Sequence, residues 1–358
     1  MKQSINKNVA LLELGGSHTE CMHLQIKALK DNGYNIFLIC NRKLFDDFPN
    51  KHDFKAVQLH DDNKSIKNRL KAILAIRKFF KQNEINTIVI NTIEISLVRD
   101  LLLFPLPKVR NYVGILHNGK KLNGGNSMFK WYRRRLNKVF VLSKDILKQI
   151  DSKGGKYFKT EAFYPIYFPC FNKISIEKPE NEFWISIPGL ISLGRKDMSY
   201  LLDSLKTTDP NQDVRIILLG QIPENEYEEI NLQLEQLSDS YKIVKFESRI
   251  PANVFDAYMQ LSNIIMPLTN VGHYGFYRIS GAYNLAYAYK IPLYLDKELN
   301  NFSDFKEIAL FYDRSKNIIN QINDLSVSDV EICKQKLINH PYLNIEEQCR
   351  HYIDFIMS

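Results

Sequence analysis

Short apolar runs alternate with helix-like segments along the first half of the chain. Runs of strand length occupy residues 9–14, 36–40, 87–91, 112–116 and 139–142. Apolar positions three or four apart between residues 22 and 29 predict a helix that ends at Gly33, and residues 66–82 predict a basic amphipathic helix. Strands separated by helices are typical of a parallel sheet with helices on both faces.

The same alternation begins again after a stretch that has no clear period. Residues 164–182 contain three prolines and several charged side chains, and we interpret this stretch as a linker. Beyond it, strand-length runs occupy residues 183–187, 214–219, 243–246, 264–266 and 293–295. The second half therefore repeats the organisation of the first half.

Together these patterns predict an α/β protein of two Rossmann-like domains that face each other across a cleft. We place the N-terminal domain at residues 1–165, the linker at 166–182 and the C-terminal domain at 183–340. Residues 341–358 are expected to form a helix that packs back on the N-terminal domain, because their apolar side chains share one helical face. These side chains are Ile345, Cys349, Tyr352, Ile353 and Ile356.

Composition and charge narrow the classes of function. The chain has 358 residues, of which 45% are hydrophobic, and its formal net charge is +8. It contains no window of the roughly 18 unbroken apolar residues that a membrane helix needs, and its polar start shows no secretory signal. Five scattered cysteines without metal-site spacing favour reduced thiols in a cytoplasmic protein. The excess positive charge suits phosphorylated substrates or an anionic membrane surface. No nucleic-acid-binding module is recognisable, so we expect no nucleic-acid partner.

Two loops in the first half carry candidate binding residues. The strand at residues 9–14 runs into Gly15 and Gly16, and His18 follows. Paired glycines let the backbone approach a ligand, although a tight strand-to-helix turn would use them as well. His117 directly follows the strand at residues 112–116. Its ordinary pKa suits proton transfer or a hydrogen bond to a sugar or phosphate oxygen, and the alternative is a histidine that caps a loop.

Two helix starts in the second half carry candidate anion-binding residues. Arg195 and Lys196 lie between a strand and a helix. A helix N-terminus favours acidic residues, so adjacent cations there indicate a bound phosphate, unless they are simply a solvated charge pair. Ser280 and Gly281 begin a second helix, whose free amides are expected to bind the same pyrophosphate. The tyrosines of that helix are expected to pack in the core or at its rim.

The segments around these candidates resemble the GT-B-fold glycosyltransferases of the family 4 type, which use nucleotide-diphosphate sugars. The resemblance covers nearly the whole chain. Besides Gly15-Gly16 and His117, it rests on "PGLISLGRKD" (188–197), "RIPANVFDAYMQLSNIIMPLT" (249–269) and "GFYRISGAYNLAYAYKIPLYL" (275–295). It implies donor phosphates at Arg195, Lys196, Ser280 and Gly281. It also implies that Arg249 and Ile250 contact the nucleotide, with no resident cofactor.

The chain departs from this family at three points. Retaining members have two glutamates where this chain has Tyr277 and Leu285, although Asn284, beside the second position, could bond the ribose. The arginine that often follows the glycine of the phosphate loop is Leu190. No Asp-x-Asp motif is present, so the resemblance implies an enzyme that needs no metal ion.

The sequence therefore predicts a glycosyltransferase that moves a sugar from a nucleotide-diphosphate donor to a surface-polysaccharide or lipid-linked glycan acceptor. His117 is the expected catalytic residue, with Gly15, Gly16 and His18 on the acceptor side. The alternative is a non-catalytic binding or scaffold protein of the same fold. A nicotinamide-dependent oxidoreductase is disfavoured, because no G-x-G-x-x-G opens either half.

Two basic segments add an expectation about location. The helix at residues 66–81 and the cluster Trp131, Tyr132, Arg133, Arg134 and Arg135 are rich in cations. They predict a peripheral contact with the inner face of a membrane. The alternative is a solvated basic face.

Overall fold

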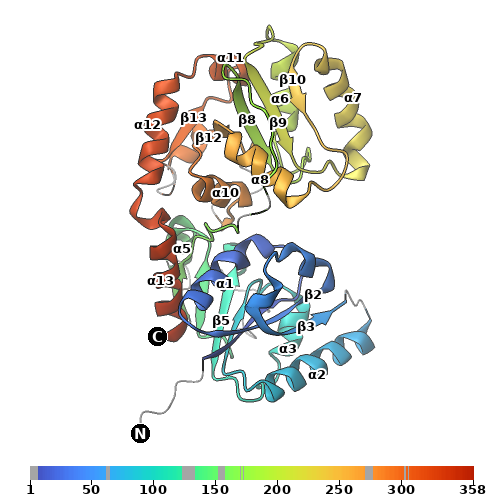
Figure 1. Ribbon diagram of the computed structural model, residues 1–358, viewed down its shortest axis with the longest axis vertical. Helices are drawn as coiled ribbons and strands as arrows, with labels where there is room; N and C mark the ends of the chain where they lie inside the picture. The colour runs from blue at the N-terminus through green and yellow to red at the C-terminus, as the bar shows by residue number, and fades with distance from the viewer. Residues whose placement is uncertain are drawn as a thin grey trace. The chain divides into compact units, whose positions relative to one another are not determined.

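The chain folds into two compact units in the computed structural model (Figure 1). The structure describes residues 7–61, 65–122, 134–151, 158–169, 171, 173–270, 277–301, 304 and 306–358. The N-terminal unit comprises Met1–Pro169, Phe276–Ile279 and Asn344–Ser358, and the C-terminal unit comprises Cys170–Gly275 and Ser280–Leu343. The predicted cluster residues Trp131, Tyr132 and Arg133 lie outside the described residues.

A parallel sheet of seven strands forms the centre of the N-terminal unit, in the order β3-β2-β1-β4-β5-β6-β7. Its strands are β1 (Asn8–Glu13), β2 (Asn35–Asn41), β3 (Phe54–His60), β4 (Thr87–Ile90), β5 (Asn111–Leu116), β6 (Lys138–Val141) and β7 (Lys159–Ala162). The central strands are buried along nearly their whole length, as expected when helices cover both faces of a parallel sheet. The strand order reverses between β1 and β4.

Five α-helices of the N-terminal unit are described around this sheet. They are α1 (Met22–Asp31), α2 (Ile66–Gln82), α3 (Ser96–Leu101), α5 (Lys144–Asp151) and α13 (Ile345–Met357). The helix α2 has the bounds that its period predicts, and the Ser65 hydroxyl caps it by accepting a hydrogen bond from the Asn68 amide.

The last helix of the chain, α13, belongs to the N-terminal unit and contacts α1. Its Tyr352 is fully buried, stacks on Phe140 at 5.5 Å between ring centres and lies beside Phe163. The Tyr352 hydroxyl donates to Gln25 Oε1 of α1 at 3.2 Å. Aromatic packing and a buried hydrogen bond thus attach the end of the chain to its beginning.

The C-terminal unit contains a second parallel sheet, in the order β10-β9-β8-β11-β12-β13. Its strands are β8 (Phe183–Pro188), β9 (Val214–Leu219), β10 (Lys242–Val244), β11 (Ile264–Ile265), β12 (Leu293–Asp296) and β13 (Ala309–Tyr312). The described α-helices are α6 (Met198–Lys206), α7 (Tyr227–Ser238), α8 (Ala252–Leu261), α10 (Gly281–Tyr289), α11 (Ile318–Asn323) and α12 (Val327–Ile338). Numbered from its own first strand, this sheet has the doubly wound order 3-2-1-4-5-6, and so do the first six strands of the other sheet.

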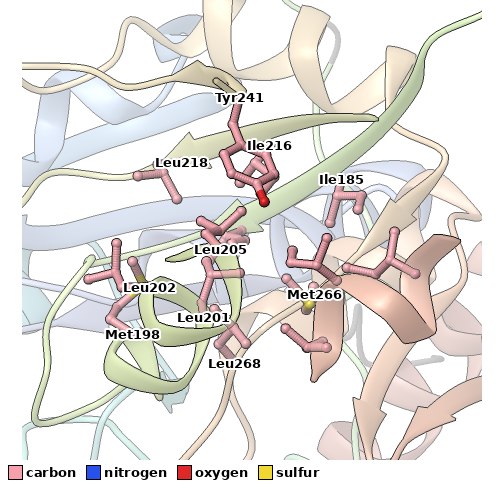
Figure 2. Close-up of a cluster of buried hydrophobic side chains, with 14 of the residues drawn as sticks. Ile185, Met198, Leu201, Leu202, Leu205, Ile216, Leu218, Tyr241, Met266 and Leu268 are labelled. Carbon is pink, nitrogen blue, oxygen red and sulfur yellow. The ribbon is translucent and has the colours of Figure 1, made fainter. Parts of the chain in front are cut away.

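The core of the C-terminal unit lies where α6 packs on the sheet (Figure 2). Leu201, Leu202 and Leu205 of α6 lie near Ile216 and Leu218 of β9. These leucines follow a helical period and the strand residues alternate, so both patterns present their apolar sides to one cluster.

Three strands were not expected from the apolar pattern: β3, β7 and β13. Each lies at an edge of its sheet. Most of their residues are only partly buried, because an edge strand has a neighbour on one side only. Their sequences therefore mix polar and apolar residues and lack the continuous apolar run of a central strand.

Part of the stretch predicted as a linker packs on the C-terminal unit. Lys178 Nζ donates to the carbonyl of Leu261 at 2.8 Å and to Asn263 Oδ1 at 2.5 Å.

Of the helices that the structure describes, none combines the length and the apolar character required to cross a membrane.

Candidate functional site

Polar side chains converge at the carboxyl ends of β1 and β4, where the order of the first sheet reverses. Glu13 ends β1 and is fully buried. Its Oε2 accepts from Asn91 Nδ2 at 2.7 Å and from Thr92 Oγ1 at 2.6 Å, and its Oε1 accepts from the Gly15 amide at 2.8 Å. Ligands of doubly wound sheets bind at such a switch point, so this edge is a candidate site.

His18 and His117 lie in this region with their rings stacked, 4.1 Å apart between centres. His117 Nε2 lies 2.8 Å from the carbonyl oxygen of Asn91. A carbonyl oxygen only accepts, so Nε2 carries the ring proton and Nδ1 is left with a lone pair. In this tautomer His117 accepts a hydrogen bond from a ligand hydroxyl through Nδ1.

The pKa values of the two imidazoles are shifted in opposite directions. Burial, and then the neighbouring charge of His18, lower the pKa of His117 to about 3, so its ring is neutral at physiological pH. Burial also disfavours a charge on His18, but a hydrogen bond and the charge of Glu20 outweigh it and raise the pKa of His18. His18 Nδ1 lies 3.1 Å from Glu20 Oε1. Of the two stacked rings, His18 therefore takes up a proton more readily than His117.

Glu94 holds the loop that carries His117. Its Oε1 accepts from the backbone amides of His117 at 2.9 Å and Asn118 at 2.7 Å. Its Oε2 is buried and has no hydrogen-bond partner among the described residues. Burial raises the pKa of this carboxyl group, although the two amides act against the shift. An unpartnered carboxylate oxygen with a raised pKa is suited to take up a proton.

We call Glu13, His18, Glu20, Asn91, Glu94 and His117 the polar cluster. Sequence patterns predicted His18 and His117 as site residues but not the other four. Two signals could have found three of them. Glu13 is a charged residue inside an apolar strand run, Asn91 directly follows β4, as His117 follows β5, and Glu94 lies three residues further along the same loop. No such signal marks Glu20, because only the αL backbone at His18 (φ 72°) and the fold around it bring this carboxylate to the imidazole.

The C-terminal unit has a second candidate site at its own switch point, between β8 and β11. The segment from Gly189 to Asp197, which we call the β8–α6 loop, pairs with the chain that follows β11. The Asn270 amide donates to the Arg195 carbonyl at 3.3 Å, the Asp197 amide donates to the Leu268 carbonyl at 2.8 Å, and Lys196 forms a bridge with Thr269.

The two neighbouring cations of this loop are in different environments. Arg195 is exposed, whereas Lys196 is only 6% exposed. Lys196 Nζ donates to the carbonyls of Pro188 at 2.9 Å and Pro267 at 2.8 Å. Burial lowers its pKa to about 7. Two adjacent exposed cations were expected here, but only Arg195 is exposed. Lys196 is buried, and its hydrogen bond to the Pro267 carbonyl attaches the loop to the chain after β11.

The first turn of α10 lies next to this loop. The Ser280 hydroxyl accepts from the Ala282 amide at 3.4 Å, and Gly281 is exposed. The Tyr283 hydroxyl lies 3.1 Å from Thr269 Oγ1, which connects α10 to the residue that pairs with Lys196. Tyr283 and Tyr287 are buried, as the packing interpretation predicted. The structure thus brings Arg195, Lys196 and the start of α10 together through Thr269.

Asn284 of α10 is 1% exposed, and its Oδ1 has no hydrogen-bond partner among the described residues. A buried amide oxygen without a partner is costly, and ligand-binding positions tolerate such groups because the ligand satisfies them. This observation supports a ligand at the start of α10.

Close backbone packing shapes the start of the β8–α6 loop. A Cβ atom on Gly220 would lie 1.8 Å from the carbonyl oxygen of Gly189, and Gly189 itself has φ +90°. Both positions therefore require glycine. Glu226 also orients the loop, because its Oε2 accepts from the Leu193 amide at 2.7 Å.

Comparisons with solved structures identify the architecture. HepE of Anabaena, solved with UDP and glucose, matches with a TM-score of 0.70 and 13% identity over 98% of this chain and 100% of HepE. A glycosyltransferase from Rickettsia africae matches with a TM-score of 0.66 and 14% identity over 99% of this chain and 98% of that chain. UDP-GlcNAc 2-epimerase from Methanocaldococcus jannaschii matches with a TM-score of 0.59 and 11% identity over 98% of this chain and 100% of that chain. No protein-family model matches the chain, and no curated protein sequence does.

The chain has the GT-B fold. The two Rossmann-like sheets predicted from the sequence are confirmed. At identities of this size the likeness shows the fold alone, and the fold also serves an epimerase.

The remaining predicted site residues occupy other parts of this GT-B fold. Arg249 and Ile250 lie in the loop between β10 and α8, and β9 separates β10 from β8. The apolar Leu190 is 40% exposed in the loop where the family often has an arginine. Gly16 is exposed with open space around its Cα, whereas a Cβ on Gly15 would lie 2.8 Å from Ile95. Among the described residues, no group of three or more His, Cys, Asp or Glu side chains is arranged to hold a metal ion.

Proposed function

We propose that the protein is a glycosyltransferase that takes a sugar from a nucleotide-diphosphate donor. The observation that carries this proposal is the site around Thr269 in the C-terminal unit, which joins the exposed Arg195 to the open first turn of α10. A guanidinium and free helix amides are the groups that bind a diphosphate. The GT-B fold of the chain supports the same assignment.

The donor side of the reaction belongs to this C-terminal site. The bond from the anomeric carbon of the sugar to the phosphate oxygen breaks, and its electron pair leaves with the diphosphate. Arg195 and the amides at Ser280 and Gly281 stabilise the negative charge that builds on this leaving group, which lowers the barrier more than it strengthens ground-state binding. When it is charged, Lys196 adds a second positive charge beside the diphosphate. The buried Asn284 binds the ribose.

The acceptor side belongs to the polar cluster of the N-terminal unit. A neighbouring hydroxyl of the acceptor donates a hydrogen bond to His117 Nδ1, while the attacking hydroxyl donates to Glu94 Oε2 and its oxygen forms the new bond to the anomeric carbon. Its proton passes to Glu94 Oε2, the buried oxygen without a partner. With a pKa of about 3, His117 orients the acceptor and does not itself carry the proton.

The finer parts of the proposal concern the acceptor and the setting. We assign a hexosyl donor, an acceptor that is a surface polysaccharide or a lipid-linked glycan, and transfer without a metal ion at the cytoplasmic face of a membrane. The basic helix α2 supports the membrane setting, since its six cations are accompanied by no acidic residue. Transfer that persists in EDTA supports metal independence, and loss of transfer in EDTA overturns it.

One observation favours a second candidate, a non-catalytic binding protein. Tyr277 and Leu285 stand where retaining relatives have glutamates, so neither position supplies a carboxylate. A protein of this kind would bind a nucleotide diphosphate without hydrolysing or transferring the donor sugar.

Calorimetry and a transfer assay test both candidates with the same proteins. We expect the parent to bind a nucleotide diphosphate, and Arg195→Ala to bind it more weakly. Its turnover is expected to fall roughly 10²- to 10³-fold, as is usual when one donor to a transition-state charge is lost. The matched control is Arg350→Ala on α13, an exposed arginine that pairs only with Glu347 among the described residues.

The outcomes separate the candidates. Binding that is weakened by Arg195→Ala, with turnover in the parent, supports the transferase. The same binding without hydrolysis or transfer of any donor supports the binding protein. If Arg195→Ala and Lys196→Ala bind and turn over the donor like the parent, the C-terminal site is wrong.

A further inference from the structure

Three large apolar side chains among the first ten residues of α2 lie on the outside. No residue from Ile66 to Ala75 is fully buried, and the helix is attached by Ile76, Phe79 and Phe80 of its second half. Ile66 is 78% exposed, Leu70 56% and Leu74 65%. A helix that covers a sheet normally turns its apolar residues inward, so this outward stripe has no explanation within the unit.

The exposed apolar side chains lie beside a row of cations. At 100° per residue, Ile66, Leu70 and Leu74 span one quarter of the helix circumference. Lys67, Lys71 and Lys78 occupy the adjoining quarter, and all three are exposed. The helix contains six lysines and arginines and no acidic residue. An apolar stripe next to a basic one is the pattern of a helix that lies in a membrane interface.

The neighbouring helix α3 contacts α2. Arg69 of α2 forms an ion pair with Asp100 of α3. Directly after α3, Leu103 is 41% exposed and Phe104 is 67% exposed. In Figure 1, α2 runs along the outer edge of the N-terminal unit. Exposed aromatic and leucine side chains of this kind insert between lipid headgroups.

We infer that this α2 surface (Ile66, Lys67, Leu70, Lys71, Leu74 and Lys78) binds an anionic lipid bilayer, with the leucines inserted and the lysines at the headgroups. The inference specifies the membrane contact of the proposed function, but it does not depend on transfer. The charge of α2 favours an anionic bilayer over a second copy of the chain, because two basic helices without acidic residues would repel each other. The exposed leucines favour the bilayer over nucleic acid, because the phosphates of nucleic acid offer no apolar surface on which leucine side chains could be buried.

Vesicle sedimentation tests the inference without any donor or acceptor. Vesicles of phosphatidylcholine with one quarter phosphatidylglycerol are expected to bind the parent, and pure phosphatidylcholine vesicles are expected to bind it far less. Leu70→Ser with Leu74→Ser should lower the partition coefficient at least about tenfold, since two apolar side chains no longer insert. Lys67→Ala with Lys71→Ala should lower it by about fivefold per lysine, and only in low salt, because salt screens charge.

Matched controls come from the C-terminal unit. Leu232 of α7 is 58% exposed, like Leu70, so Leu232→Ser controls for the loss of any exposed leucine. Lys334→Ala with Lys336→Ala on α12 controls for net charge. Both controls should bind the vesicles like the parent. Because all the replaced side chains are exposed, the thermal unfolding midpoint should stay unchanged, and nucleotide-diphosphate binding should too.

Three outcomes would overturn the inference. One is equal sedimentation of the parent and the Leu70, Leu74 double variant. Another is a loss in the Leu232 control as large as the loss in that variant. The third is a parent that does not bind vesicles but is dimeric in solution, with the double variant monomeric, which makes the surface a protein interface. Failure to bind nucleotide would instead contradict the proposed function and leave this result unaffected.

Discussion

A neutral imidazole at position 117 sets what the polar cluster can do. Its proton is committed to the Asn91 carbonyl, and burial keeps the ring from taking a second one. Burial disfavours a charge on His18, but its hydrogen bond with Glu20 and the charge of Glu20 raise the pKa of His18, so His18 takes up a proton more readily than His117. At the scale of single residues, the site therefore offers one acceptor nitrogen and one unpartnered carboxylate oxygen, Glu94 Oε2, to incoming hydroxyls.

A half-buried histidine outside the cluster gives a prediction about stability and pH. His23 of α1 makes no hydrogen bond among the described residues and lines a cavity of about 110 Å³. Its ring lies 6.0 Å from those of Phe48 and Phe168. Burial lowers its pKa from 6.5 to about 4. Between these pH values the unfolded chain binds a proton that the folded chain does not, so the free energy of unfolding falls as the pH falls.

We therefore expect His23→Leu to lose less stability than the parent between pH 6.5 and pH 4. Urea unfolding at a series of pH values measures the difference. Phe48→Leu changes the same cavity without removing a titratable group, so its effect should not vary with pH. The prediction is contradicted if the free energies of unfolding of the parent and of His23→Leu differ by the same amount at every pH in this range.

Lys196 gives a second prediction at this scale. Its pKa of about 7, against an ordinary 10.5, leaves it mostly neutral between those values. A bound diphosphate would raise that pKa, because an anion favours the charged form. Binding of a nucleotide diphosphate in this pH range should therefore take up a proton. Titration calorimetry in buffers of different ionisation enthalpy measures the uptake.

Arginine stays charged throughout this range, so Lys196→Arg, if it folds, should bind without proton uptake. Arg195→Lys is the matched control, because it changes the exposed neighbour and leaves Lys196 in place. Uptake that survives in Lys196→Arg would place the titrating group elsewhere.

At the scale of elements, each candidate site lies where strand order reverses. The polar cluster occupies the ends of β1, β4 and β5, and the β8–α6 loop pairs with the chain after β11. At a reversal, the two connections leave the sheet in opposite directions and open a space between their loops. Side chains at these strand ends can face a ligand without being covered by a crossover helix.

Close packing of two loops at such an end gives a third prediction. A Cβ on Gly220 would collide with the backbone of Gly189, whereas a Cβ on Gly194 would meet nothing nearer than Ser192 Oγ at 4.0 Å. We expect Gly220→Ala to lower the free energy of unfolding by about 3 kcal/mol or more, since backbone atoms must move. It should also weaken nucleotide binding by displacing the loop.

Gly194→Ala in the β8–α6 loop is the control and should change stability by less than about 0.5 kcal/mol. Denaturant unfolding compares the two variants directly. Equal stability of Gly220→Ala and Gly194→Ala would show that the approach of Gly220 to Gly189 is not close.

At the scale of the whole molecule, two cores are built from one chain, and the last helix belongs to the first core. The helix α13 follows the whole C-terminal unit in the sequence, yet it belongs to the N-terminal unit. Tyr352 is its main attachment, through Phe140, Phe163 and Gln25. The carbonyl of Ile356 also accepts from Asn111 Nδ2 of β5 at 2.5 Å.

We therefore predict that Tyr352→Ala destabilises the N-terminal unit by about 3 to 5 kcal/mol, the usual cost of removing a buried aromatic ring. Hydrogen exchange locates the effect: amides of β1 to β7 should exchange faster, and amides of β8 to β13 should not. Tyr342→Ala, at a side chain 46% exposed in the C-terminal unit, is the control. Faster exchange in both sheets would mean that the two cores unfold together.

The sequence by itself determined the elements that depend on local pattern. The central strands, α2 and the start of α10 lie where period, apolar runs and the pair Ser280-Gly281 predicted them. The two Rossmann-like sheets followed from their order, because strands alternating with helices form parallel sheets, and the resemblance to GT-B glycosyltransferases supplied the name of the fold. His117 and Arg195 were predicted for the same reason, since His117 directly follows a strand and Arg195 lies in the loop after one, at the edge of a parallel sheet where ligands bind.

Only the tertiary structure decided which atoms meet. Glu13 and Asn91 are 78 residues apart and form a buried hydrogen bond because β1 and β4 are neighbours in the sheet. Lys196 is buried although Arg195 beside it is exposed, and α2 turns its leucines outward. Period and composition are properties of adjacent residues, whereas burial and pairing depend on strand order and on what packs across from each side chain. No local pattern contains that information.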